Sequence, residues 1–485
     1  MEIHSFTDDP LFILAVGILV VVGGIIGLRL HAFLALLLGA FVVSLLTPDA
    51  SIIAYITGNG GSLNAAQKLI DQNVGVRIAT EFGATCGKIG ILIAMASIIG
   101  KTMLESGAAE KIVRSTLNLT GEKNAPFTFL GSSFFIAIPV FFDTVFYLMI
   151  PLAKAMAMRI KKNYLLLVLC TTAGAAMAHS LVPPTPGPLF LVAEMDIPIG
   201  MMMIGGLLVG SVTIIAGYFY AAWANKKWPV MVRDAPDAPL EEIKKLSEKD
   251  TSKLPPIGFS LLPILIPVLL ISLDALLGTF ADDPAGQSGI TKFMMLSFGF
   301  LGEKNLAIAL GAISSLILLA SQKKGDKEGL KKSVQTALMS AGVIILITSA
   351  GGAFGAMLQQ TAISTRIAEL TSGYQMALIP LAFLITAIIR TAQGSATVAM
   401  ITAAGILAGM ATSMSLDYHQ LYIGLAIACG SKLIPWMNDS GFWIVCKMSN
   451  LTEQEALKTF SPLLTIMGIV GLIVILVAAS LFPLV

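Results

Sequence analysis

The sequence predicts an all-α polytopic membrane protein built from two inverted repeats, each with five transmembrane helices and one helical hairpin. The first observation is composition: of 485 residues, 56% are hydrophobic and 12% are charged, and the mean hydropathy is +0.85. A soluble domain needs a polar surface that such a chain cannot supply. The second observation is a series of apolar stretches long enough to cross about 30 Å of hydrocarbon. The third is that their order recurs in both halves of the chain.

Composition also excludes several classes of protein. The net charge is only +2, and no basic run is interleaved with aromatic residues, so no nucleic-acid partner is expected. The four cysteines are scattered without a CxxC pair, which argues against a zinc site and a disulfide framework. We therefore expect no metal and no cofactor. The first apolar segment follows an acidic N-terminus and is interpreted as a retained span.

Ten apolar stretches are interpreted as single spans, at residues 11–28, 32–48, 91–104, 163–182, 198–224, 257–280, 305–320, 334–358, 420–436 and 461–484. Two further apolar regions, 126–153 and 376–411, are too long for one crossing and are interrupted at Pro139 and around Arg390. Each is predicted to form a helical hairpin, either re-entrant or fully crossing the membrane.

A hairpin returns the chain to the side it left, and on that basis most lysines and arginines outside the spans fall on one face. The positive-inside rule places this face in the cytoplasm and both termini outside. The polar stretch 225–256 is then a cytoplasmic linker between an N-terminal repeat, 1–224, and a C-terminal repeat, 257–485. The odd number of crossings in the first repeat inverts the second.

Two spans are predicted to be broken helices, over 163–188 and 420–449. Residues 180–183 of the first correspond to residues 432–435 of the second, and the hairpin breaks correspond as well. Inverted repeats of secondary transporters bring two broken helices and two hairpins together near the midplane, where substrate and coupling ions bind. The sequence therefore predicts a binding site at these breaks.

The first hairpin carries Asp143, the single charged residue between Pro126 and Ala153. A carboxylate at the centre of a membrane helix costs roughly 2.5 to 3.5 kcal/mol on insertion scales, so its presence indicates a role. It could carry a coupled proton or coordinate a cation. It could instead form a structural ion pair with Lys432 or His179.

In the second hairpin, Arg390 lies at the break within a group of polar residues. A guanidinium with hydroxyl, amide and backbone donors nearby suits a carboxylate that bears several hydroxyls. Alternatively, Arg390 pairs with Asp143 or Asp439 and holds the hairpin in place. Substrate contact is predicted for the neighbouring set Thr391, Gln393, Gly394, Ser395 and Thr397.

In the first broken helix, residues 178–188 include four prolines, which cannot all lie inside a helix. Ser180 and Thr185 are predicted to line the resulting gap. The half-helix that follows would direct its N-terminal amide groups at an anion. His179 could relay a proton or form a structural hydrogen bond to a neighbouring helix.

In the second broken helix, Asn438 and Ser440 are predicted substrate contacts, and Asp439 is predicted to carry the coupling proton or cation. Asp439 or Ser440 could also cap the short helix that follows. Lys432 is expected to neutralise Asp439 or Asp143, and a structural role is favoured for it over the alternative, substrate binding.

Four motifs lie at these positions: IPVFFDTVFYLMIPL at 138–152, HSLVPPTPGP at 179–188, RTAQGSATVA at 390–399 and NDSGFW at 438–443. They resemble, in sequence and order, the motifs of the gluconate permease family, GntP. The resemblance implies cation-coupled, usually proton-coupled, uptake of gluconate or related sugar acids across the bacterial inner membrane, with D-serine carried by some members. It also implies the dimeric elevator architecture of the wider ion-transporter superfamily.

The chain departs from that family's pattern at three places, one of which is the first hairpin, where residues 143–151 read DTVFYLMIP instead of the more usual DVGFVLLIP. Members commonly carry a second histidine where this chain has Thr185, and a His-Val pair where it has Trp436 and Met437. The loss of two imidazoles and the gain of the Trp436 indole change both charge and volume at the predicted site, which favours a small polar carboxylate in general over gluconate in particular.

The leading hypothesis is a symporter for a small hydroxylated carboxylate, driven by H⁺ or Na⁺, with membrane lipid around it and a homodimer implied by the resemblance. A cation/proton antiporter is the main alternative, and a passive channel is disfavoured because two matched breaks suit alternating access. An intramembrane enzyme is not expected, because the chain contains neither HExxH nor GxSxG.

Overall fold

The computed structural model describes residues 8–58, 60–233, 254–280, 289–363, 366, 375–413, 416–437 and 439–484. Every regular element in this part of the chain is a helix. The N-terminal half contributes α1 (Pro10–Ile26), α2 (Ala32–Leu46), α3 (Asp49–Gly58), α4 (Leu63–Ile70), α5 (Val74–Glu105), α6 (Ala108–Thr120), the 3-10 turn η2 (Glu122–Asn124), α7 (Ala125–Ile136), α8 (Phe142–Ile160), α9 (Tyr164–Leu181), α10 (Pro186–Glu194) and α11 (Ile199–Lys227). The C-terminal half contributes α13 (Ile257–Phe280), α14 (Gly289–Leu301), α15 (Lys304–Gln322), α16 (Lys327–Gln359), the 3-10 turn η5 (Gln375–Ala377), α18 (Leu378–Gln393), α19 (Ala396–Ser413), α20 (Leu421–Gly430), α21 (Ser440–Ser449) and α22 (Glu453–Leu481).

Seven helical segments of the described chain are long and apolar enough to cross a membrane, or eight if the bent pair α2 and α3 forms one span. The seven are α5, the pair α9 and α10, α11, α13, α15, α16 and α22. The remaining predicted spans and hairpin arms correspond to shorter apolar helices, including α1, α18, α19 and α20. The short helices α3, α4, α6 and α14 have no counterpart among the predicted spans, because each is too short or too polar to stand out in hydropathy.

The span predicted at 91–104 is wrong in its bounds, because α5 already begins at Val74. The first half of α5 carries charged side chains, which lower its hydropathy without ending the helix. Arg77 is buried there and donates hydrogen bonds to the Ser44 hydroxyl at 2.5 Å and to the Gln360 side-chain oxygen at 3.3 Å. A helix that satisfies its own backbone can keep such a charge inside once side-chain partners are present.

The long helices α5 and α16 pack directly against each other. A Cβ atom on Gly352 of α16 would lie 2.0 Å from the Thr85 hydroxyl of α5, so this crossing requires a glycine. A similar approach joins α16 to α19, where a Cβ on Gly355 would lie 2.7 Å from the Gly405 Cα. Small residues at crossings are typical of helix packing in membranes.

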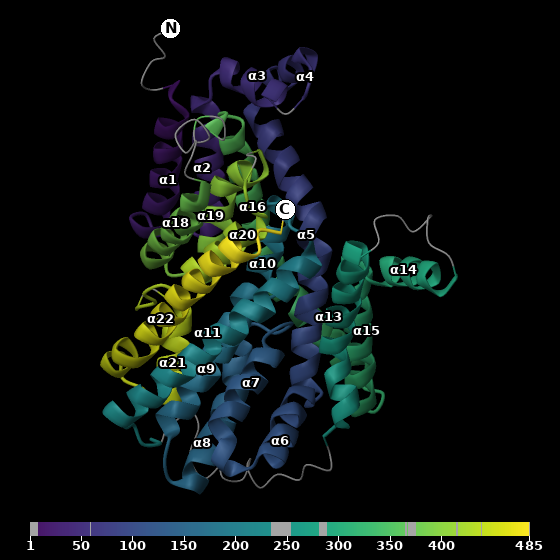
Figure 1. Cartoon of the computed structure of the whole chain (residues 1–485), viewed down its shortest axis with the longest axis vertical. Helices are drawn as coiled ribbons and strands as arrows, with labels where there is room; N and C mark the ends of the chain where they lie inside the picture. Colours follow the sequence, from purple (N-terminus) through teal and green to yellow (C-terminus); the bar gives the residue numbers. More distant parts are fainter. Residues whose placement is uncertain are drawn as a thin grey trace.

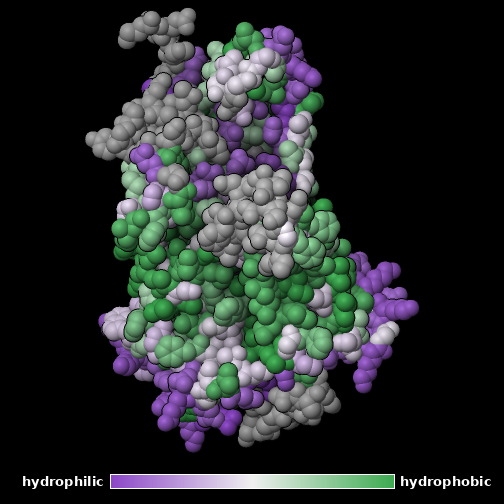
Figure 2. Space-filling view, turned by 45° about the vertical axis from the view of Figure 1, so that its right-hand side comes forward, coloured by the Kyte–Doolittle hydropathy of each residue, from purple (hydrophilic) through white to green (hydrophobic). Residues whose placement is uncertain are grey.

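The outer surface is apolar around the middle of the molecule. Figure 2 shows a hydrophobic belt between two hydrophilic ends on the face in view. Large apolar side chains stand exposed on several different helices, among them Leu208, Phe219, Ile317, Ile388 and Ile473. A soluble monomer rarely exposes a continuous apolar surface of this kind, whereas a membrane protein presents it to lipid.

The two hairpin regions lie in opposite halves of the molecule. Figure 1 shows α7 and α8 in the lower part of the view and α18 and α19 in the upper part. In the first, the break between the arms lies at residues 137–141; in the second, Gly394 ends α18 with a positive φ of 84°. Glycine adopts this left-handed conformation without the steric cost of a Cβ, so the turn between α18 and α19 is encoded locally.

Candidate functional site

Residues from both hairpins and both broken helices line one cavity of about 430 Å³, called here the central cavity. From the N-terminal half come Phe141, Phe142, Asp143, Thr144, Ala176, His179 and Pro186. From the C-terminal half come Ser340, Ile344, Ile347, Arg390, Ser395, Ala396, Thr397, Val398, Ile401, Lys432, Asp439, Ser440, Gly441, Ile444, Phe460 and Leu464. The cavity is of a size that holds a small organic molecule.

Four helices begin at the wall of the central cavity: α8, α10, α19 and α21. The first N–H groups of a helix have no partner within it, and the helix dipole is positive at that end. Helix N-termini therefore attract anions. The contribution of α10 is the weakest, because prolines at positions 186 and 188 remove two of its donors.

Two of these helices have their first N–H groups capped by a side chain that lies just before the helix in sequence, and this cap fixes the residue at which the helix begins. Asp439 is the N-cap of α21, and its Oδ1 accepts a hydrogen bond from the Gly441 N–H at 2.8 Å. Before α19, the Ser395 hydroxyl accepts a hydrogen bond from the Val398 N–H at 3.3 Å. The capping role proposed for Asp439 from the sequence is therefore present.

The Arg390 side chain joins the second hairpin to the second broken helix. Its Nη2 lies 2.5 Å from Oδ2 of Asp439, and its Nε donates to the Ser431 carbonyl at 3.0 Å. Its Nη1 donates to the Gly394 carbonyl. Arg390 and Asp439 are both buried. The sequence allowed Arg390 either to contact the substrate or to form an ion pair with Asp143 or Asp439. The structure contains the ion pair with Asp439.

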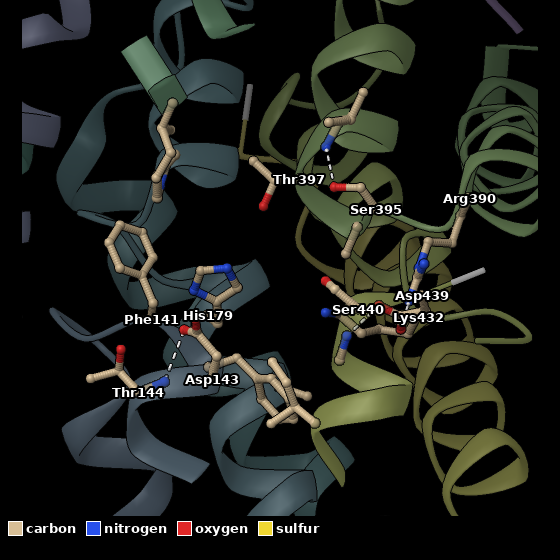
Figure 3. A pocket seen from close by; sticks show the side chains of 18 of the residues that line it. Phe141, Asp143, Thr144, His179, Arg390, Ser395, Thr397, Lys432, Asp439 and Ser440 are labelled. Carbon is tan, nitrogen blue, oxygen red and sulfur yellow. Dashed lines mark hydrogen bonds and ion pairs between the residues drawn. The ribbon is translucent and has the colours of Figure 1, made fainter. Parts of the chain in front are cut away.

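Lys432 also lies in the cavity wall, beside Asp439 (Figure 3), and only 4% of it is exposed. None of the ion pairs among the described residues involves Lys432. The expectation that Lys432 neutralises Asp439 or Asp143 is therefore wrong as a direct ion pair, because Arg390 holds Asp439.

Asp143 and His179 face these residues from the other side of the cavity (Figure 3). Oδ1 of Asp143 accepts a hydrogen bond from the Thr144 N–H at 2.8 Å, and in the part of the chain that the structure describes Asp143 forms no ion pair. The His179 ring packs edge-on against Phe141 with 5.9 Å between ring centroids, and its buried Nδ1 has no hydrogen-bond partner there. The structural ion pair considered for Asp143 is thus not formed.

Seven of the predicted site residues line the central cavity: Asp143, His179, Arg390, Ser395, Thr397, Asp439 and Ser440. Four others lie next to it without lining it, namely Ser180, Thr185, Thr391 and Gly394. The Thr185 hydroxyl donates to the Val182 carbonyl at 2.8 Å, so it is used within the break, whereas the buried Ser180 hydroxyl has no partner among the described residues. Asn438 and the side chain of Gln393 lie outside the described residues.

Trp436 is not part of the cavity wall. Its indole N–H donates to the Thr391 carbonyl at 2.9 Å, and 41% of the side chain is exposed. This contact ties the second broken helix to the second hairpin. The large volume of Trp436 therefore does not shape the central cavity, contrary to what the sequence suggested.

Sequence reasoning also missed several wall residues. Ser340, Ile344 and Ile347 lie at helical spacing on α16, and Phe460 and Leu464 lie on α22. Their spacing in the sequence indicates that the residues of each helix lie on one face of it. Hydropathy does not tell whether that face contacts lipid, protein or a cavity. No group of three or more metal-ligating side chains occurs among the described residues.

A second cavity, of about 580 Å³, lies at the other end of α10 and contains none of the predicted site residues. Its wall includes Tyr55, Glu81, Thr85, Lys88, Glu194 and Gln359. The Thr85 hydroxyl donates to the Glu194 carboxylate at 3.4 Å. The α10 helix therefore runs from the central cavity at Pro186 to this second cavity at Glu194.

Broken helices around a cavity lined by several charged side chains, inside an apolar exterior, define a multi-pass membrane protein that handles a small molecule. The sequence profile of the GntP family permeases matches residues 9–482, and the chain belongs to this family. A permease of Haemophilus influenzae is 31% identical over 96% of this chain and 92% of its own length. A gluconate permease of Pseudomonas aeruginosa is 32% identical over 81% of this chain and 85% of its own. These relatives are permeases, and the chain is not an enzyme.

Among solved structures, the chain is similar to MtrF of Neisseria gonorrhoeae, described as one of a class of antimetabolite efflux pumps. The TM-score is 0.61 at 15% identity, and the match covers 86% of both chains. YdaH of Alcanivorax borkumensis, a transporter described as having an unusual topology, gives a TM-score of 0.58 at 13% identity over 87% of this chain and 90% of its own. At such identities the likeness concerns the fold alone.

Proposed function

We propose that this protein is a secondary active symporter that takes up gluconate, or a related small hydroxylated carboxylate, together with a proton. The observation that carries the proposal is the central cavity itself. Cationic side chains and helix N-termini on one side face the unpaired carboxylate of Asp143 on the other. The names of the Pseudomonas aeruginosa relative and of a low-affinity gluconate transporter of Escherichia coli, which is 29% identical over 93% of this chain, support gluconate as the cargo.

The charge balance of the central cavity explains why substrate binding is coupled to the uptake of a proton. A carboxylate that enters the central cavity adds a negative charge beside the buried side chains of Arg390 and Lys432, and an uncompensated charge in the protein interior is expensive. A proton on Asp143 removes one negative charge from the same cavity. Asp439 is less suited to this task than the sequence suggested, because both of its oxygens are already engaged, by Arg390 and by the Gly441 N–H. Binding of the anion and protonation of Asp143 then favour each other.

The helices support an inverted-repeat architecture, which we include in the proposal with repeats at 1–224 and 257–485. The pair α5 and α16 have 32 and 33 residues, and α11 and α22 have 29 each. In each half, a hairpin and a broken helix stand between these two elements in the same order. We further propose that the hairpins and broken helices move together as the transport domain of a homodimer in the bacterial inner membrane, with both termini outside.

Uptake of labelled gluconate into proteoliposomes tests the proposal. An inward proton gradient should drive accumulation above equilibrium, and a protonophore should abolish it. The Asp143→Asn variant should lose this accumulation but retain exchange of gluconate between the two sides, because its site remains permanently neutral. An inward Na⁺ gradient at equal pH identifies Na⁺ coupling if it alone drives uptake. Cation-driven proton release without any bound sugar acid would instead support an antiporter and contradict the proposal.

A further inference from the structure

The central cavity contains one cation more than its structural ion pair needs. Arg390 and Asp439 neutralise each other, and Lys432 remains buried beside them with no ion-pair partner among the described residues. Both oxygens of Asp439 are occupied, Oδ2 by Arg390 at 2.5 Å and Oδ1 by the Gly441 N–H at 2.8 Å. Lys432 could gain Asp439 as a partner only if one of these contacts broke.

The remaining carboxylate of the cavity, Asp143, lies on the opposite wall (Figure 3). It accepts a hydrogen bond from its own helix terminus, through the Thr144 N–H. The two charges are therefore separated by the space that a ligand would fill. A buried ammonium without a counter-ion is costly, and a chain that keeps one at a cavity wall gains if a ligand supplies the counter-ion.

We propose that Lys432 is the counter-ion of the substrate carboxylate, and that Arg390 is a positioning residue that holds the hairpin to the broken helix through Asp439. This inference rests on the proposed function and assigns its anion-binding group. An ammonium is a compact charge with three donors on a flexible stem. It can bind one carboxylate oxygen and an adjacent hydroxyl at once, which fits a 2-hydroxy monocarboxylate.

The N-terminus of α21 shares the wall of the central cavity with Lys432, since Ser440 and Gly441 line it too, and the Gly441 N–H already donates a hydrogen bond to Asp439. A helix N-terminus adds positive potential without adding a second full charge. A neutral polyol bound at the same wall would supply no counter-ion to the Lys432 ammonium. The assignment therefore predicts discrimination between a sugar acid and the polyol of the same length.

Calorimetric binding of gluconate and of glucitol, its neutral analogue, tests the assignment on three detergent-solubilised variants. The wild type should bind gluconate and not glucitol. The Lys432→Met variant should lose at least about tenfold in gluconate affinity, as expected when a charge-assisted contact is removed. The Lys432→Arg variant should retain part of the affinity, because the charge stays. Lys447→Met removes an exposed lysine from α21 and should change nothing.

A second readout separates substrate binding from a structural role. Without ligand, Lys432→Met should unfold at the same temperature as the wild type or higher, because the substitution removes an unpaired buried charge. Unchanged gluconate affinity in Lys432→Met would overturn the assignment, and so would a variant that fails to fold. If the wild type itself binds no sugar acid, the proposed function fails, and that result is distinct from either of these.

Discussion

Replacing Asp439 by Asn should destabilise the protein strongly, and a second substitution, Lys432→Met, should recover part of the loss. Asn keeps an oxygen that can accept the Gly441 N–H, so the start of α21 is preserved. What is lost is the charge opposite Arg390, at 2.5 Å in the wild type. Two buried cations, Arg390 and Lys432, then remain in one wall of the cavity without a carboxylate beside them.

The expected size follows from the burial of the pair, since Arg390 is 3% exposed and Asp439 is 8% exposed. Removal of one partner from a buried ion pair costs about 3–5 kcal/mol, because the other charge is left uncompensated. Lys432→Met removes a like charge from the same wall. The two substitutions should therefore be non-additive, with a coupling of about 0.5–3 kcal/mol, the range seen for residues that share one charge network.

Equilibrium unfolding in mixed micelles of the wild type, both single variants and the double variant gives this coupling free energy. Lys432→Met should stabilise the Asp439→Asn background more than it changes the wild type. Lys447→Met, on the exposed face of α21, should be neutral in both backgrounds. Additive effects of Asp439→Asn and Lys432→Met, within about 0.5 kcal/mol, would refute the charge account of the cavity.

Three further predictions test the packing and the limits of the site. Trp436→Phe removes the indole hydrogen bond to Thr391 and should leave gluconate affinity within about twofold of the wild type, because Trp436 lies outside the cavity wall; a large loss of affinity in calorimetry would place it in the site. Gly352→Val should lower the free energy of unfolding by at least about 1–3 kcal/mol through the clash with Thr85, whereas Val at Gly342, whose added Cβ would meet nothing within 4 Å, serves as the matched control. Gly394→Ala should cost about 1–2 kcal/mol in the same unfolding assay because of its φ of 84°, and equal stability would show that the turn after α18 tolerates a side chain.

Helix ends that are set by proline or glycine can be predicted from the sequence alone. The prolines at positions 183–188 predicted a break, and α9 ends at Leu181 while α10 begins at Pro186. The glycine at position 394 marks the turn between α18 and α19 in the same way. Proline and glycine restrict or release the backbone whatever surrounds them, so their effect can be inferred without tertiary structure.

Features that depend on contacts between residues distant in the chain cannot be inferred from the sequence. Arg390 had two candidate acids in the sequence, and only the packing of α18 against the second broken helix selects Asp439. The start of α5 was missed because its charged first half is held by partners distant in the chain, such as Gln360 for Arg77. Lys432 was assigned a structural role for the same reason, since a sequence does not show which of two cations takes the single nearby acid.

The most direct test of the account is the number of protons that enter with each substrate molecule. A pH electrode, or a pH-sensitive dye inside proteoliposomes, can record proton uptake when gluconate is added to the outside, alongside the uptake of labelled gluconate. About one proton should enter with each gluconate in the wild type, since one carboxylate enters a cavity in which Asp143 is the one acid without an ion pair among the described residues. No coupled proton should enter with Asp143→Asn. Gluconate accumulation without proton uptake, or proton uptake that persists in Asp143→Asn, would contradict the account.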